Sequence, residues 1–224
     1  MKKDLETICA DGLLFFGNNN RLISHELKNV LAIISETLGL IEELIELNET
    51  GMKLDPGKLK SLSNSVIEEV SRANSIIRNM NAFAHSVDEF VGEVDINQSV
   101  DLIIRLSRLD SSLRNTEIIF NPSEKRILFT SPFFLGALIY HAIDFAVLCA
   151  GSNKKIEIST SQDTRGLIIV FSGLGDIKGT FPSERVSVLA NALSAQIDIA
   201  HSQGEMSVFL PQEIEDDLLK NLVS

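Results

Sequence analysis

The sequence predicts an α+β protein, in which a long helical hairpin precedes a mixed β-sheet with helices on one face. Three observations predict it. Apolar residues recur every three or four positions through two long N-terminal runs, as on one face of an α-helix. After about residue 90, short strand-like runs alternate with helical ones. The chain has 224 residues and a hydrophobic fraction of 44%, which is ample for a packed core.

The first helical run covers about residues 19–49, where Asn19 or Asn20 can cap its start. Its apolar stripe consists of Ile23, Leu27, Val30, Ile34, Leu38, Ile41 and Ile45. A segment rich in Gly, Pro and Asp follows at 48–58, and a second helical run covers about residues 56–86. Two long amphipathic helices joined by a short turn predict an αα-hairpin.

The apolar surface of this hairpin is wider than one helix–helix contact covers. The first stripe is broadened by Leu31, Ile33, Leu40, Leu44 and Leu47. Pairing two hairpins by two-fold symmetry covers such a surface most simply. We therefore expect a homodimer whose hairpins form a four-helix bundle.

The remaining elements follow in order after the compositional change at residues 85–98. We expect helices at about 96–110, 131–150 and 183–195, and strands at 116–122, 125–131, 155–162, 166–173 and a pair within 195–211. Ser131-Pro132 and Ser183 are good helix starts. The predicted domains are an N-terminal extension (1–20), the hairpin (21–90), the α/β domain (91–212) and a tail (213–224) that can form a short helix.

Composition excludes several classes of function. The net charge of -11 and the pI of about 4.8 argue against a nucleic-acid binder and against docking on anionic lipid. No apolar run reaches the roughly 18 residues of a membrane span, and the N-terminus is a poor signal peptide. We therefore expect a cytoplasmic protein. Cys9 and Cys149 are far apart in sequence and are expected to be reduced, buried thiols.

His25 is the first candidate for chemistry. On a helical wheel it lies about 200° from Ile23 and Leu27, so it points away from the apolar stripe. An exposed neutral imidazole can attack phosphorus, and the resulting phosphoramidate keeps a high transfer potential. From position alone, a solvated histidine on a surface helix remains the alternative interpretation.

The residues around His25 decide between these interpretations. Residues 24–34, SHELKNVLAII, resemble the H-box of the sensor histidine kinases, which lies on the first helix of their dimerisation and histidine-phosphotransfer hairpin. Val30 stands where that family has a proline that kinks the helix, so a straighter helix is expected here. The resemblance implies that His25 is the phosphorylation site, that Glu26 is its acid/base neighbour and that Asn29 is a positioning group.

The resemblance extends over nearly all of the chain after about Asn20. Residues 94–100 (VDINQSV) are similar to the opening of the family's ATP-binding domain. Residues 134–146 fall where its N-box helix belongs, and residues 167–177 fall where its G1 box belongs. Residues 189–211 are similar to its closing helix and hairpin. The resemblance therefore implies a histidine-kinase ATPase-like domain after the hairpin.

The ligand-binding residues of that ATP-binding domain are missing. His141 occupies the place of the N-box Asn that holds Mg²⁺, the earlier N-box Asn falls on Ala137, and imidazole is a poor ligand for this cation. Ser172, or Phe171 in a shifted register, takes the place of the adenine-reading Asp, and Asp176 comes several residues late.

Only "KGTFPSERV" is left for an ATP lid and a second glycine-rich box, and a Gly-x-Gly at Gly173 and Gly175 is weak by itself. We expect neither ATP nor a metal or other cofactor to bind, and the domain to be kept as a scaffold or docking surface. The histidine at position 141 is expected to be bonded within the protein, and His85 and His201 to be structural or surface residues.

These features together predict a histidine phosphotransferase of a bacterial phosphorelay. It would exchange a phosphoryl group between His25 and response-regulator receiver domains, which carry their own Mg²⁺. Lys28 and Arg72 are the candidates to meet the acidic site of a receiver. Two alternatives stay open: an atypical histidine kinase with a divergent ATP site, and a non-catalytic dimeric pseudokinase that binds a receiver or a kinase.

Overall fold

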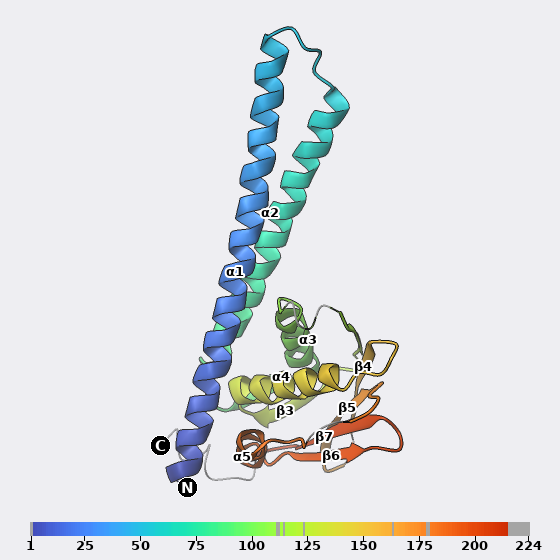
Figure 1. Cartoon of the computed structure of the whole chain (residues 1–224). Coiled ribbons are helices and arrows are strands. Elements are labelled where there is room, and N and C mark those ends of the chain that lie inside the picture. Colours follow the sequence, from blue (N-terminus) through green and yellow to red (C-terminus); the bar gives the residue numbers. More distant parts are fainter. Residues whose placement is uncertain are drawn as a thin grey trace. The chain divides into compact units, whose positions relative to one another are not determined.

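A computed structural model describes residues 2–110, 113, 115–122, 124–162, 164–177 and 180–214 (Figure 1). The chain divides into two compact units. One consists of Asn19–Asn81 and the other of Met1–Asn18 with Ala82–Ser224. The tail helix expected within 213–224 lies almost entirely outside the described residues. None of the helices in the described part combines the length and the apolarity needed to cross a membrane.

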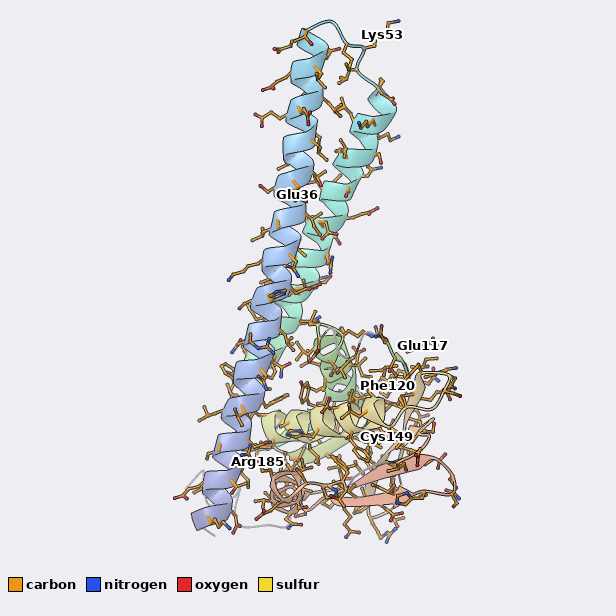
Figure 2. The ribbon with its side chains drawn as sticks, in the orientation of Figure 1. Glu36, Lys53, Glu117, Phe120, Cys149 and Arg185 are labelled. Atoms are coloured by element: carbon orange, nitrogen blue, oxygen red, sulfur yellow. The ribbon has the colours of Figure 1, made fainter. Side chains whose placement is uncertain are left out.

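The unit Asn19–Asn81 is a hairpin of two antiparallel helices, formed by parts of α1 (Lys2–Glu49) and α2 (Pro56–His85). Lys53 lies in the turn between them (Figure 2). The side chain of Asp55 accepts a hydrogen bond of 2.8 Å from the backbone N–H of Gly57, which caps α2 at Pro56. Since α1 begins at Lys2, the helix start expected at Asn19 or Asn20 is wrong, and Asn19 is buried inside the helix.

The hairpin buries only one side of each apolar stripe. Ile23 and Val30 on α1 and Ile76 on α2 are buried. Large apolar side chains elsewhere on the hairpin are 37–63% exposed, namely Leu31, Ile33, Leu38, Leu40, Ile45, Met52, Ile67, Val70 and Ile77. These exposed apolar side chains are the ones that the sequence predicts to be covered by a second copy.

The second unit is built on a five-stranded mixed sheet of order β2-β4-β5-β7-β6. Its strands are β2 (Glu117–Asn121), β4 (Lys155–Gln162), β5 (Gly166–Ser172), β6 (Gln196–Ala200) and β7 (Glu205–Pro211). β2 runs parallel to β4, and the other pairs are antiparallel. Helices α3 (Ile96–Ser107), α4 (Pro132–Leu148) and α5 (Glu184–Ala192) lie on one side of this sheet (Figure 1). The predicted α+β architecture is therefore confirmed.

Local sequence explains these elements. In β4 the buried residues alternate with exposed ones, as in a strand with one face against a core. The side chains of Asp95 and Ser183 accept backbone N–H bonds at the starts of α3 and α5. Ser131 is the N-cap of α4 with a proline in its first turn, as expected. A second, two-stranded sheet pairs β1 (Gly92–Asp95) with β3 (Ile127–Thr130), and β1 was not expected as a strand.

The first turns of α1 belong to this second unit. Phe15 is 3% exposed, and its ring lies against those of Phe83, Phe133 and Tyr140, with centroids 5.3–5.5 Å apart. Residues 2–20 of the predicted extension are therefore helical, and Gly12 and Phe15 pack against α4. Cys149, just after α4 (Figure 2), is buried as expected. The expectation that Cys9 is buried is wrong, because this thiol is exposed.

Candidate functional site

His25 is exposed on α1 and meets a side chain one turn further along the helix. Nδ2 of Asn29 lies 3.3 Å from Nδ1 of His25. Four-residue spacing brings the two side chains onto one face of the helix. The second ring nitrogen of His25, Nε2, has no hydrogen-bond partner in the described part of the chain. Nε2 is therefore the nitrogen that an incoming group can reach.

Glu26 leaves the helix on a different face from His25. Only 4% of Glu26 is exposed. One carboxylate oxygen, Oε1, accepts a hydrogen bond from Nη2 of Arg72 on α2, and the other, Oε2, accepts one of 3.4 Å from Nδ2 of Asn29. A carboxylate this deeply buried requires a cationic partner, and Arg72 supplies it across the hairpin.

Arg72 also donates from Nη1 to Oε2 of Glu69, three residues before it on α2, over 3.4 Å. Sequence reasoning missed Glu69, although the i,i+3 spacing of opposite charges on a helix was a visible signal. The structure thus brings His25, Glu26, Asn29 and Arg72 into one connected group. Lys28 is exposed and forms no ion pair with any described residue.

Similarity to known proteins is found in structure and not in sequence. No protein-family model matches the sequence, and a search of curated proteins found no match either. A solved structure of a bacterial phosphotransferase is 11% identical, aligns over 88% of this chain and 95% of its own, and gives a TM-score of 0.51. This chain shares that fold.

Two histidine kinase structures align with lower TM-scores. Acinetobacter baumannii histidine kinase AdeS is 14% identical over 86% of this chain and 98% of its own, with a TM-score of 0.44. The ATP-binding domain of PrrB from Mycobacterium tuberculosis is 20% identical over 55% of this chain and 98% of its own, with a TM-score of 0.43. At these identities the site must be judged from its own residues.

The side chain at the N-box position is already bonded within the protein. Nε2 of His141 lies 2.9 Å from Oδ2 of Asp11, a carboxylate whose side chain is 6% exposed. This confirms that His141 is a satisfied helix histidine. The cavity beside it has a volume of about 210 Å³ and is also lined by Arg185 (Figure 2). Ordinary ligand pockets measure about 300–1,000 Å³.

The two glycines at the G1 position have a structural use. Backbone N–H of Gly175 donates to the carbonyl of Cys149 over 2.8 Å, and that of Gly151 donates to the carbonyl of Gly173 over 3.0 Å. A Cβ on Gly175 would lie 2.9 Å from the Cα of Gly151, and Gly173 has a φ of +93°. Because glycine has no side chain, two backbone segments can pack together here. This packing explains both glycines without a role in binding phosphate.

The residues at the N-box and G1 positions lie in two separate cavities. His141 lines one cavity, whereas Gly175 and Asp176 line another, and the two cavities share no residue. Among the described residues, no group of three or more His, Cys, Asp or Glu side chains could hold a metal ion. An imidazole engaged by a carboxylate also offers no oxygen to Mg²⁺.

Proposed function

We propose that this protein is a histidine phosphotransferase of a two-component phosphorelay, with His25 as the phosphoryl carrier. One observation carries the proposal: His25 is exposed on a long helical hairpin, with Nδ1 against Asn29 and Nε2 open to an incoming group. A partner as large as a protein domain must reach the reacting nitrogen, so an exposed position on a helix is required.

The proposed donor and acceptor are response-regulator receiver domains. On loading, the P–O bond of a receiver's phospho-aspartate breaks, a P–N bond forms at Nε2 of His25, and the imidazole gives up one proton to solvent. The carboxylate of the receiver leaves with the electron pair of the broken bond. The receiver supplies the Mg²⁺ that neutralises the transferred group, so catalysis on this side consists of positioning.

Two cations near His25 are proposed to meet the acidic site of the receiver. Lys28 is exposed, three residues further along α1. Arg72 is directed at Glu26 and Glu69, yet 45% of its side chain remains exposed. We propose that Lys28 gives the stronger electrostatic attraction, because its charge is not already offset by a carboxylate.

The active form is proposed to be a homodimer. The exposed apolar side chains of the hairpin, including Leu31, Leu38 and Ile77, form the surface available to a second copy. Two-fold pairing would cover these side chains and leave His25 outside, since it lies on a different face of α1.

A partner, rather than ATP, is proposed to load His25. The proposal is supported by the bond between His141 and Asp11 and by the backbone packing of Gly151 against Gly175. If ATP alone loaded the protein, the atypical-kinase alternative would replace this proposal.

The test is phosphate transfer to the purified full-length chain. We expect no label from γ-labelled ATP alone, and label from a phosphorylated receiver domain. The label should disappear in His25→Ala and persist in His85→Ala, a matched control because His85 is also exposed on a helix. Label from ATP alone would support a kinase. Binding of the receiver without any label would leave a non-catalytic binding module.

A further inference from the structure

A hydrogen-bonded chain crosses the hairpin from α2 and ends at the ring of His25. Arg72 donates to Oε1 of Glu26, Oε2 of Glu26 accepts from Nδ2 of Asn29, and the same Nδ2 faces Nδ1 of His25. We propose that Arg72, Glu26 and Asn29 are positioning residues that keep Nδ1 of His25 unprotonated and thereby protect a phosphoryl group held on Nε2. This inference rests on the proposed function, because it concerns the phosphorylated state of His25.

The direction of each bond follows from the chemistry of its groups. An ionised carboxylate can only accept hydrogen bonds, so the Asn29 amide must turn its NH₂ group toward Glu26. The second N–H of that group then faces Nδ1 of His25, at 3.3 Å. Nδ1 must therefore be the acceptor. A neutral ring then carries its proton on Nε2.

Arg72 fixes which end of the Asn29 amide faces Glu26. If the amide of Asn29 were inverted, its oxygen would face Oε2 of Glu26, and two acceptors would repel each other. The inverted orientation of the Asn29 amide is therefore excluded while Glu26 is an ionised carboxylate held in place. The guanidinium of Arg72 bonds Oε1 of Glu26 and holds this buried carboxylate in place. The charge on α2 thus sets the orientation of an amide on α1.

The consequence for a phosphorylated His25 concerns the leaving group. With the phosphoryl group on Nε2, the lone pair of Nδ1 accepts from Asn29, so the same bond serves both states of the ring. Hydrolysis breaks the P–N bond, and the ring leaves easily only after Nδ1 has taken a proton, because neutral imidazole then departs instead of an anion. A donor facing Nδ1 opposes that proton and slows the loss of phosphate.

The same bond also slows loading. In the unphosphorylated ring the proton sits on Nε2, and it must leave that nitrogen before the in-plane lone pair can attack phosphorus. Breaking the chain of hydrogen bonds should therefore speed both the uptake and the loss of the phosphoryl group. A purely structural role of Arg72 would predict neither change in a variant that stays folded.

The first test reads the position of the proton directly. The ¹⁵N chemical shifts of the His25 ring in the full chain should show Nε2–H and an unprotonated Nδ1. In Asn29→Leu this preference should be lost, whereas Arg78→Met should keep it. Arg78 is a matched control because it lies on α2 and bonds Ser75 rather than Glu26. A wild-type ring with its proton on Nδ1 would overturn the proposal.

The second test measures the lifetime of phosphohistidine without any receiver. Potassium phosphoramidate can donate the phosphoryl group, with ammonia as the leaving group, and ³¹P NMR at pH 7 then follows the signal that His25→Ala lacks. Asn29→Leu and Arg72→Met should shorten the lifetime about fivefold, the factor expected for one ordinary hydrogen bond. Arg72→Lys should restore part of it, and Arg78→Met should match the wild type.

The outcomes separate this inference from the proposed function. Equal lifetimes in wild type and Asn29→Leu would refute the protective role, even if a receiver labels His25 normally. Failure of every receiver to label His25 would refute the phosphorelay role, while the ring proton and the lifetime of the chemically phosphorylated protein would still report on the three positioning residues. Helix content measured by circular dichroism checks that Arg72→Met is folded. If Arg72→Met is unfolded, the lifetime of phosphohistidine in Asn29→Leu, a substitution that removes no charge, tests the protective role.

Discussion

Replacing Phe15 by alanine should strongly destabilise the unit formed by residues 1–18 and 82–224. Phe15 is 3% exposed, and its ring centroid lies 5.3 Å from that of Phe83, 5.5 Å from that of Phe133 and 5.4 Å from that of Tyr140. Truncating a buried Phe to Ala costs about 3–5 kcal/mol. In a chain of this size, each kcal/mol lowers the Tm by about 2–4 °C, so a fall of about 6–20 °C is expected.

The assay is thermal unfolding followed by calorimetry, with two comparison variants on the same helix. Leu13 is 73% exposed, so Leu13→Ala should change the Tm little. Phe16 is 37% exposed and stacks on Phe83 with centroids 5.6 Å apart, so Phe16→Ala should have an intermediate effect. The expected order of destabilisation is Phe15, then Phe16, then Leu13.

A result in which Phe15→Ala and Leu13→Ala unfold at the same temperature would refute this reasoning. It would mean that the first turns of α1 do not contribute to the core of the unit. Hydrogen exchange offers an independent check, because amides of α4 near Tyr140 should lose protection in Phe15→Ala and keep it in Leu13→Ala.

Three further predictions concern single positions in the fold. Burial raises the pKa of the half-buried Asp144 carboxyl, although the nearby His141 lowers it, and ionising such a group costs stability. Thermal scans across pH should therefore find Asp144→Asn more stable than wild type at pH 7, and this advantage should disappear well below the ordinary pKa of an Asp carboxyl, where the Asp144 side chain is neutral in both the folded and the unfolded chain. Urea titrations should find that Gly175→Ala loses more than about 1 kcal/mol, because the new Cβ would lie 2.9 Å from a backbone atom, whereas Gly39→Ala, with nothing within 4 Å, gains about 0.5–1 kcal/mol. In the same assay Ser183→Ala should lose about 1 kcal/mol with the N-cap bond of α5, and an unchanged midpoint would argue against that cap.

Local patterns were enough to predict most elements of the fold. The periodicity of residues 19–49 and 56–86 predicted both helices of the hairpin, and the caps Ser131 and Ser183 were recognised from residue type. Residues 2–18 were missed as helix because the run Leu13–Phe16 is apolar on every side and shows no 3.6-residue period. Its inward face is decided by contacts with α4, more than 100 residues away in sequence.

In the candidate site too, some features follow from local sequence and others only from tertiary packing. Outward placement of His25 and its spacing to Asn29 follow from helix geometry alone, so the sequence by itself determined them. The partner of Glu26 did not follow, because Arg72 lies 46 residues away and reaches it only through the packing of α2 on α1. The pairing of His141 with Asp11, which are 130 residues apart in sequence, could not be predicted from the sequence either. Periodicity, caps and turns are local and are written in neighbouring residues, whereas the partner of a buried charge depends on which distant segments the fold brings together.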